Sequence, residues 1–247
     1  MNKGLKEIES ITIIGRGNVA WLYSDIMTKQ GLSVNCISSR GEIRGDDLCS
    51  DLIIIAVSDK AIVEVAKKLE IGDSIIVHTS GTVDIGVLRA RAKNFGVFYP
   101  LQTISKGIEL DFSTIPLCIE GSDEEIFSLL KNLADKLSKK VYKISSVQRQ
   151  AIHIAAVFAN NFTNHLFGIA KQELEKNDIP FDILFPLISQ TIEKIKENNP
   201  FEVQTGPAKR NDIPVMEKHK LRLGEDEREI YQLLSEKIIK QNEVLKK

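Results

Sequence analysis

A glycine-rich segment near the amino terminus has the residue types and spacing of a phosphate-binding turn. Residues 11–20 read Ile-Thr-Ile-Ile-Gly-Arg-Gly-Asn-Val-Ala, and Gly15, Gly17 and Ala20 occupy the fixed positions of a GxGxxG/A motif. The first glycine makes a tight turn, the second lets the backbone approach a pyrophosphate, and a small third residue lets a helix pack closely on the strand. We therefore predict dinucleotide binding on the amides that begin this helix. The alternative is a fold that keeps the turn and binds no nucleotide.

The end of the next apolar run indicates which dinucleotide would bind. An NAD site has Asp or Glu about 20 residues after the first glycine, but neither occurs between Asp25 and Glu42. The run ends instead at Ser38, Ser39 and Arg40, whose hydroxyls and guanidinium suit a 2′-phosphate. This predicts NADP(H) rather than NAD(H), unless Arg40 is only a solvated loop cation. The predicted cofactor-binding residues are Gly15, Arg16, Gly17, Asn18, Val19, Ala20, Ser38, Ser39, Arg40, Val57, Ser58 and Thr79.

Polar side chains on a long, otherwise apolar helical stretch are candidates for chemistry on a substrate. His153, Asn160 and Asn164 are spaced by seven and four residues, so they project from one stripe of a helix. In a reductase we expect His153 to be the proton donor, because an imidazole titrates near neutrality, and Asn160 or Asn164 to hold a carbonyl or imine. The alternative is a core histidine bonded to a backbone carbonyl, with asparagines that tie helices together.

Three loops leave the carboxyl ends of predicted strands, where ligands bind in open α/β sheets. The first contains Ser58, the second Thr79 and Ser80, and the third Gln102. We expect Ser80 to present its hydroxyl to a substrate and Gln102 to bind the substrate. The alternative for Thr79 and Ser80 is a cap ahead of a helix predicted over residues 83–93.

An irregular segment over residues 204–214 carries the remaining candidates for substrate binding. Long irregular segments in compact domains are often functional. We expect Arg210 to bind a carboxylate or phosphate through paired hydrogen bonds, and Asp212 to orient Arg210 or His219. The alternative is a rigid connection between helices in which Asp212 is a helix cap.

The elements that would position these residues fall into two halves. Up to about residue 145, short apolar runs alternate with helical patterns, and several runs are apolar throughout, as in strands covered on both faces. The runs are residues 11–14, 32–37, 52–57, 74–77, 95–99, 115–119 and 141–144. Their alternation with helices predicts a doubly wound α/β sheet of the Rossmann type over residues 1–145. Helical patterns over 147–176, 181–196 and 226–245 predict an all-α domain over residues 146–247.

The composition excludes several other classes of protein. The 247 residues carry 33 Lys and Arg against 34 Asp and Glu, so no basic excess points to nucleic acid or an anionic membrane surface. No apolar run reaches the roughly 18 residues that span a bilayer. Three widely spaced cysteines predict neither a disulfide framework nor a cysteine zinc site and favour a reducing cytoplasm, and no metal-site motif occurs.

Strings spread over nearly the whole chain resemble one family. They are Gly15–Ala20, His78–Gly81, Tyr99–Thr103, Ala155–Phe158 with Asn161 and Phe162, and Gln204–Ala208 with Arg210 and Asp212. Together they resemble a bacterial family of Rossmann-like proteins with a carboxyl-terminal DUF2520 domain. The resemblance implies a Rossmann domain followed by a helical domain, and an NADP oxidoreductase or a protein of the F420-dependent type.

In the first half, Asp51–Val57 followed by Ser58 and Asp59, and then His78–Gly81, resemble the cofactor domain of the 6-phosphogluconate dehydrogenase-like superfamily. This superfamily includes pyrroline-5-carboxylate reductase, ketopantoate reductase and the β-hydroxyacid dehydrogenases. The β-hydroxyacid dehydrogenases carry a Lys and, four residues later, an Asn on the corresponding helix. Here no Lys lies between Lys143 and Lys171, and Val157 stands four residues after His153. This departure puts the transfer of that family's chemistry in doubt.

Two functions from different classes therefore stand side by side. The first is an NADP(H)-dependent oxidoreductase that transfers hydride to or from a small carbonyl, imine or alcohol bound between the domains. The second is a non-catalytic NADP-binding or sensor protein, which the absent lysine favours. An F420-dependent enzyme is a third interpretation, against which Arg40 argues. We also expect apolar surface on the helical half to form a homodimer.

Overall fold

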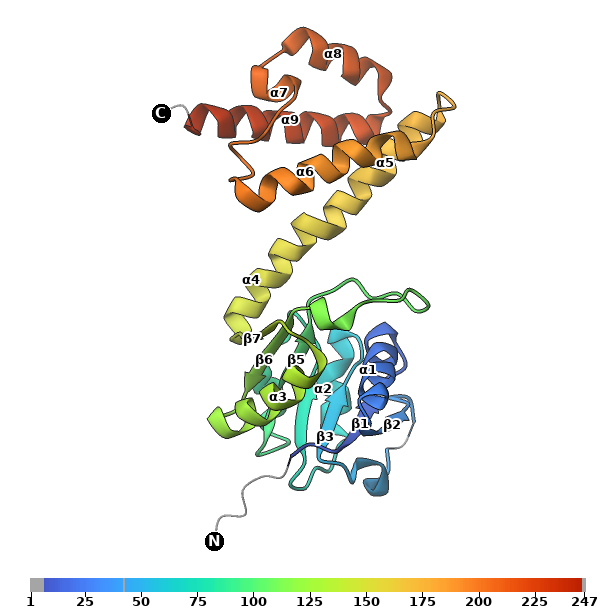
Figure 1. The fold of residues 1–247 in the computed structure, drawn as a ribbon, viewed down its shortest axis with the longest axis vertical. Coiled ribbons are helices and arrows are strands. Elements are labelled where there is room, and N and C mark those ends of the chain that lie inside the picture. Colours follow the sequence, from blue (N-terminus) through green and yellow to red (C-terminus); the bar gives the residue numbers. More distant parts are fainter. Residues whose placement is uncertain (1–6, 42, 246–247) are drawn as a thin grey trace. The chain divides into compact units, whose positions relative to one another are not determined.

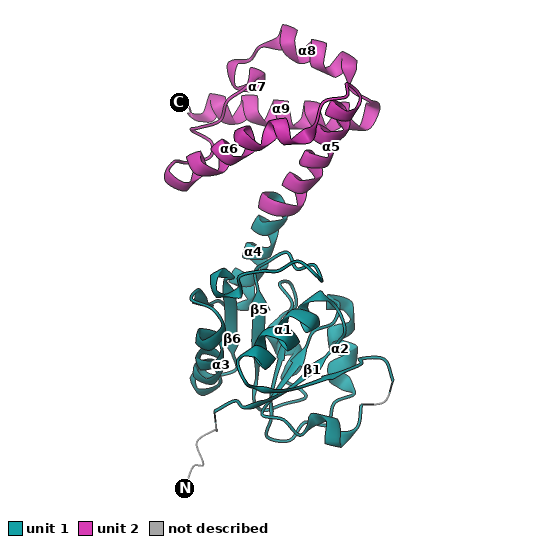
Figure 2. Cartoon of the chain, turned by 45° about the vertical axis from the view of Figure 1, so that its right-hand side comes forward, with its two compact units in different colours: residues 1–158 teal, residues 159–247 magenta. Residues whose placement is uncertain are grey.

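The computed structural model describes residues 7–41 and 43–245, and the chain divides into two compact units, residues 1–158 and 159–247 (Figure 2). The first unit contains a seven-stranded sheet with flanking helices, and the second is helical. The predicted α/β fold with an all-α carboxyl-terminal part is confirmed. The boundary predicted at residues 145–146 falls at the start of helix α4 (Ser146–Ala156), whereas the compact units divide after Phe158.

The strands of the sheet follow the order β2-β1-β3-β4-β5-β6-β7 (Figure 1). They are β1 (Ser10–Ile14), β2 (Ser33–Ile37), β3 (Leu52–Ile55), β4 (Ile75–His78), β5 (Phe95–Pro100), β6 (Leu117–Gly121) and β7 (Val141–Lys143). The neighbours from β2 to β5 are parallel, so their carboxyl ends share one edge of the sheet. That edge is where an open α/β sheet binds its ligands.

The sixth strand departs from the parallel pattern, because β6 is antiparallel to β5, and β7 runs parallel to β6. The connecting residues 101–116, all of them described, contain the 3₁₀ turn η3 (Phe112–Thr114) and no α-helix. A parallel crossover usually needs the length that a helix provides. The chain therefore returns in the opposite direction.

Helices cover both faces of the sheet, which explains why β3 is buried along its whole length. Leu52 and Ile54 pack with α1 (Asn18–Lys29) and α3 (Glu124–Leu137), whereas Ile53 and Ile55 pack with α2 (Asp59–Lys67). Successive side chains of a strand point to opposite faces, so a strand covered twice is apolar without interruption.

The prediction of a helix over residues 83–93 is wrong. The structure has only the 3₁₀ turn η2 (Ile85–Leu88), extended by turns that are closed by bonds from Arg89 N to Gly86 O and from Arg91 N to Leu88 O. Gly86 and its β-branched neighbours disfavour an α-helix. Asp84 also bonds the Gly86 amide through its side chain and starts the tighter turn.

The predicted helix over residues 147–176 is present with a π-helical interruption. The π-helical segment Val157–Phe162 follows α4, and α5 (Thr163–Glu175) follows that segment. The rest of the second unit consists of η5 (Phe181–Leu184), α6 (Phe185–Glu197), α7 (Pro207–Arg210), α8 (Ile213–Arg222) and α9 (Glu225–Leu245). The irregular segment predicted over 204–214 thus contains one helical turn, which Pro207 begins and the left-handed Asn211 ends.

Contacts within the second unit join its last three helices. The His219 Nδ1 atom lies 2.9 Å from the Tyr231 hydroxyl, which ties α8 to α9. Asn242 Nδ2 donates to the carbonyl of Lys209 at 3.0 Å, which ties α9 to α7. Among residues 7–41 and 43–245, no helix combines the length and the apolar composition that crossing a bilayer requires.

Candidate functional site

A groove of about 1010 Å³ lies at the edge of the sheet where the parallel strands end. Its walls come from the turns after β1, β2, β3 and β4, from the end of β5, and from the helices α1 (Asn18–Lys29), α2 and α4, all within the first unit. The lining residues are Gly15, Arg16, Gly17, Asn18, Val19, Ser38, Ser39, Arg40, Ala56, Val57, Ser58, Asp59, Ala61, Glu64, Val65, Lys68, Thr79, Ser80, Gly81, Tyr99 and His153. Except for Ala20, every residue predicted to bind the cofactor lines this groove. Ala20 is buried in the core behind the turn, as its role in close packing requires.

The two glycines of the turn meet different surroundings. Gly15 has φ +142°, and a Cβ placed on it would lie 2.2 Å from the carbonyl oxygen of Ala56. A Cβ on Gly17 would have no atom within 4 Å. The fold therefore requires glycine at position 15, whereas at position 17 it leaves open space against the groove.

This open space fits the pyrophosphate of a dinucleotide. Helix α1 begins directly after Gly17, and no side chain caps its first amides. Its first turn also carries no acidic residue that would repel an anion. Uncapped amides at a helix start, next to a glycine that nothing crowds, suit two linked phosphate groups.

The segment after β5 is tied to the glycine turn. Asn18 Nδ2 donates to the Ile104 carbonyl at 2.7 Å, and Lys106 Nζ donates to the Arg16 carbonyl at 2.9 Å. The Asn18 side chain thus anchors this segment. In a nucleotide site, Asn18 would therefore act by fixing the position of the glycine turn.

The other end of the groove carries hydroxyls and positive charges. Ser38, Ser39 and Arg40 follow β2, and the Ser38 hydroxyl accepts the Arg40 amide at 3.1 Å. Lys68, the C-cap residue of α2, also lines the groove. A phosphate on the adenosine ribose would find two hydroxyls and one or two cations here.

The loop after β4 is held by its own polar groups. The Ser80 hydroxyl oxygen accepts the amides of Thr82 and Val83, each at 3.0 Å, so the predicted capping bonds exist although the predicted helix does not. The Thr82 hydroxyl donates to Asp59, which lines the groove from α2. Ser80 still lines the groove, with its oxygen already engaged.

Three residues from three elements meet next to this loop. A Cβ built on Gly81 would lie 2.8 Å from His153 Nδ1 and 3.0 Å from the Tyr99 hydroxyl. His153 comes from α4 and Tyr99 from β5. Because Gly81 has no side chain, the imidazole and the phenol both reach the groove at one place. Sequence reasoning assigned no role to Tyr99, although its position at the end of a strand was a usable signal.

A buried arginine lies one helical turn before His153. The Arg149 side chain is completely buried, and its Nη2 donates to the Val83 carbonyl at 2.8 Å and to the Ser146 hydroxyl at 3.0 Å. Glu120 lies 3.4 Å from the same nitrogen. Within the part of the chain that the structure describes, Arg149 Nε and Nη1 have no hydrogen-bond partner. Burial lowers the pKa of Arg149, and the charge of Glu120 opposes this shift.

Five other predicted site residues are not among those that line this groove. The Gln102 side chain is exposed and accepts the amide of its neighbour Thr103 at 2.8 Å. Asn160 and Asn164 lie in the second unit, in the π-helical segment and in α5. Arg210 is exposed at the end of α7, and Asp212 caps α8 by accepting the Val215 amide at 3.3 Å. A role for these five residues in substrate binding or catalysis stays a prediction.

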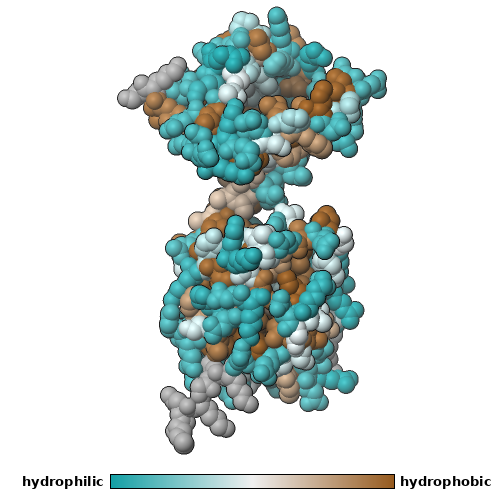
Figure 3. Space-filling view, in the orientation of Figure 1, coloured by the Kyte–Doolittle hydropathy of each residue, from teal (hydrophilic) through white to brown (hydrophobic). Residues whose placement is uncertain are grey.

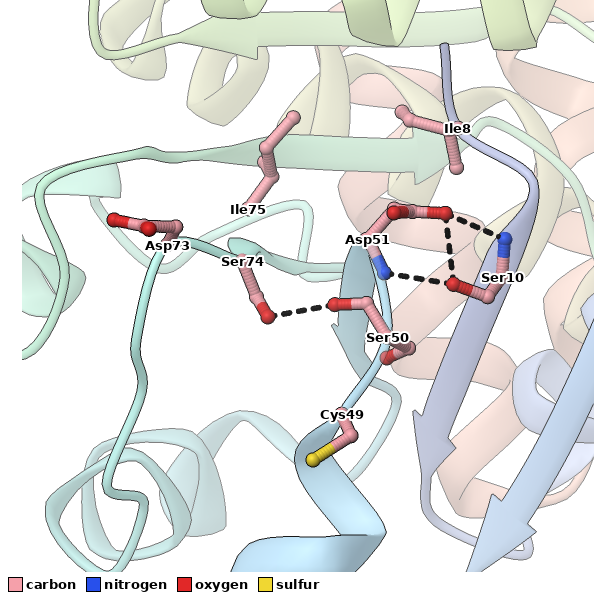
Figure 4. Close-up of a pocket in the computed structure, with 8 residues that line it drawn as sticks. All are labelled: Ile8, Ser10, Cys49, Ser50, Asp51, Asp73, Ser74 and Ile75. Carbon is pink, nitrogen blue, oxygen red and sulfur yellow. Dashed lines mark hydrogen bonds between the residues drawn. The ribbon is translucent and has the colours of Figure 1, made fainter. Parts of the chain in front are cut away.

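A second cavity, of about 330 Å³, lies at the opposite edge of the sheet (Figure 4). Its polar groups bond one another: Asp51 accepts both the amide and the hydroxyl of Ser10, and the Ser74 hydroxyl donates to the Ser50 carbonyl at 2.6 Å. These bonds join the amino-terminal ends of the strands. The cavity is therefore structural. Among the residues described, no cluster of three or more His, Cys, Asp or Glu side chains is arranged to hold a metal ion.

The fold is of the Rossmann type, and the groove lies at the carboxyl ends of the parallel strands, where this fold binds dinucleotides. The model of a family described as a domain of unknown function, DUF2520, matches residues 115–238. The chain belongs to this family.

Solved structures with the same fold include a candidate NADP oxidoreductase from Bacteroides fragilis. It is 33% identical, with a TM-score of 0.86, over 95% of this chain and 98% of that one. A reductive aminase from Aspergillus terreus, in complex with NADPH4, cyclohexanone and allyl amine, is 12% identical, with a TM-score of 0.65, over 96% and 95% of the two chains. An imine reductase from Myxococcus stipitatus in complex with NADP⁺ is 13% identical, with a TM-score of 0.56, over 96% and 94%. The last two show the fold alone. A comparison with curated proteins finds no match.

Proposed function

We propose that this protein is an NADP(H)-dependent oxidoreductase that acts on a small carbonyl, imine or alcohol. The observation that carries the proposal is the continuous groove from the uncrowded Gly17 to the polar pair Tyr99 and His153. Its two ends fit the phosphates and the reactive end of a dinucleotide. The Bacteroides fragilis relative, a candidate NADP oxidoreductase, supports this choice of cofactor and reaction class, and so does the reductive aminase solved with NADPH4.

When bound, the nicotinamide supplies or accepts the hydride. The chain's own residues bind, orient and handle the proton. The amides at the start of α1 hold the phosphates, and Ser38, Ser39 and Arg40 hold the 2′-phosphate. At the other end of the groove, His153 takes part in the exchange of a proton with the substrate.

Arg40 tests the choice of cofactor. We expect Arg40→Ala to weaken NADPH binding by about tenfold or more, because charge-assisted bonds to phosphate are lost, and to leave NADH binding unchanged. Titration of nucleotide fluorescence measures both affinities. Arg91→Ala, which removes an exposed arginine outside the groove, is the matched control and should alter neither affinity. Equal weakening of NADPH and NADH binding by Arg40→Ala would argue against a 2′-phosphate site.

A non-catalytic NADP-binding protein is the second candidate, favoured by the absence of any Lys between Lys143 and Lys171. Both candidates predict NADPH binding. Only the enzyme predicts NADPH oxidation with a panel of 2-keto acids, imines and aldehydes, and loss of that oxidation in His153→Ala. Binding without turnover across the panel would favour the sensor.

We further propose that the helical unit mediates a homodimer. Of its described residues, only Ala208 and Met216 are buried hydrophobic residues, while Leu221 is 82% exposed and Leu187 65% exposed. Apolar side chains are visible at its surface in Figure 3. So much exposed apolar area is unusual for a monomer. Light scattering tests the proposal, and a monomeric mass at micromolar concentration would refute it.

The free thiols of Cys36 and Cys49, both exposed, support a reducing cytoplasm as the compartment.

A further inference from the structure

The Tyr99 hydroxyl lies beside Gly81 at one end of the groove. Tyr99 stands near the carboxyl end of β5, whose neighbour β4 leads directly into the loop with Gly81. Both the Tyr99 hydroxyl and His153 Nδ1 lie within 3.0 Å of the point where a Gly81 Cβ would stand. Both residues also line the groove. A strand end, a loop and a helix thus bring two proton-carrying groups to one point.

Hydrogen bonds hold this arrangement in place. Helix α4 binds the loop through three side chains: Gln150 Nε2 donates to the Thr82 carbonyl at 3.0 Å, Arg149 donates to the Val83 carbonyl, and the Ser146 hydroxyl accepts the Ile85 amide at 3.0 Å. His153 is therefore fixed relative to Gly81. Proton transfer needs such fixed geometry, because it is sensitive to the distance between donor and acceptor.

The surroundings keep Tyr99 protonated. Burial raises the pKa of the Tyr99 phenol, and the positive charge of Arg149 opposes part of that shift. The phenol therefore carries its proton at neutral pH and can donate it. Arg149 also places a positive charge where it would stabilise the phenolate left after donation. His153 Nδ1 is buried and has no hydrogen-bond partner in the described chain, so the fold leaves this nitrogen unengaged.

We propose that Tyr99 is the catalytic proton donor in the reaction proposed above, and that His153 restores its proton. As hydride reaches the carbonyl or imine carbon, the electron pair of the double bond moves to oxygen or nitrogen, which takes the Tyr99 hydroxyl proton. The Tyr99 oxygen keeps the O–H electron pair and takes a proton from protonated His153. His153 then regains a proton from water, and oxidation of an alcohol or amine runs through the same steps in reverse.

The inference rests on the proposed oxidoreductase function, so the first test needs no substrate. The chain has four tyrosines, whose Cζ carbon resonances are observable by NMR after isotopic labelling, and Tyr99→Phe identifies the Tyr99 signal. We expect NADP⁺ to shift this resonance and to leave that of Tyr142 unchanged, since Tyr142 is exposed on β7. Failure of NADP⁺ to bind at all would refute the proposed function. Binding that leaves the Tyr99 signal unmoved would refute the role of Tyr99 alone.

The second test uses turnover with any substrate that the panel yields. Tyr99→Phe keeps the ring that packs beside Gly81 and removes only the hydroxyl. We expect kcat to fall about 100-fold, as for loss of a general acid, with little change in KM or in NADPH affinity. Tyr142→Phe is the matched control and should retain full activity. Arg149→Met removes a positive charge that lowers the pKa of Tyr99, so this pKa, read from the Cζ resonance, should rise. If Arg149 served only to hold the loop after β4, the pKa of Tyr99 would stay unchanged. A kcat for Tyr99→Phe within threefold of the wild-type value would overturn the proposal.

Discussion

At position 15 the backbone conformation and its close neighbours require glycine, whereas at position 17 the protein has space for a side chain. The left-handed φ of +142° and the 2.2 Å approach to the Ala56 carbonyl together exclude any side chain at position 15. Position 17 has an ordinary φ of −76° and no neighbour within 4 Å of a Cβ. Glycine also suits an N-cap, which Gly17 provides for α1, and the open space beside it is consistent with the proposed approach of a ligand.

These two glycines make a matched pair of predictions. We expect Gly17→Ala to change the free energy of unfolding by less than about 1 kcal/mol and to weaken NADPH binding about tenfold, because the new methyl group occupies phosphate space. We expect Gly15→Ala to destabilise the protein by more than about 2 kcal/mol through strain and overlap. Urea denaturation followed by Trp21 fluorescence measures stability, and calorimetry measures NADPH binding. Unimpaired binding in Gly17→Ala would remove the main support for the cofactor site.

Among the elements, α4 carries both Arg149 and His153. Its start is fixed by a capping box: the Ser145 hydroxyl accepts the Gln148 amide at 3.4 Å, and the Gln148 side chain accepts the Ser145 amide at 2.9 Å. One turn later Arg149 binds the loop after β4, and His153 follows on the same face. The N-cap that fixes the start of α4 therefore also helps to fix the positions of Arg149 and His153.

Removal of the cap tests how much this start contributes. We expect Ser145→Ala to lower the free energy of unfolding by about 1 kcal/mol, the usual effect of losing an N-cap hydroxyl. Ser128→Ala is a suitable control, because the exposed Ser128 hydroxyl bonds only the Glu124 carbonyl within α3. The control should change stability by less than about 0.5 kcal/mol. Equal stabilities of Ser145→Ala and wild type in urea would show that packing alone fixes the start of α4.

Sequence reasoning worked best for elements whose own residues determine them. The apolar run of β3 could be predicted from its own residues, because a strand that is buried on both faces accepts few polar residues. The glycine turn could be predicted in the same way, because a positive φ favours glycine. The helix predicted over residues 83–93 failed, since one glycine and a side-chain turn outweighed its periodic pattern. Tyr99 and Arg149 were not assigned a role, because what they touch depends on how β5, the loop after β4 and α4 come together.

At the scale of the whole molecule, a buried histidine couples stability to acidity. His78 is fully buried, and its Nδ1 accepts the Ser80 amide at 3.2 Å, so the neutral ring carries its proton on Nε2. Burial, followed by the charge of Arg149, lowers the pKa of His78 from 6.5 to about 4, while the carboxylates of Asp59 and Asp84 oppose the shift. The folded protein therefore keeps His78 neutral at acidities where the unfolded chain takes up a proton.

This linkage predicts a loss of stability in mild acid. Above pH 6.5 His78 is neutral in both the folded and the unfolded protein, and it adds no pH dependence. As the pH falls from 6.5 to 4, only the unfolded protein gains the proton on His78, so the free energy of unfolding should fall by up to about 3 kcal/mol. Below pH 4 this contribution levels off. Urea denaturation from pH 7 to pH 4.5, read from the fluorescence of Trp21, the only tryptophan, measures it. His78→Asn should lose less stability than the wild type over this range, and His165→Asn, which replaces an exposed histidine, should follow the wild type. Identical pH profiles for His78→Asn and wild type would show that His78 is not the group that is linked to acid unfolding.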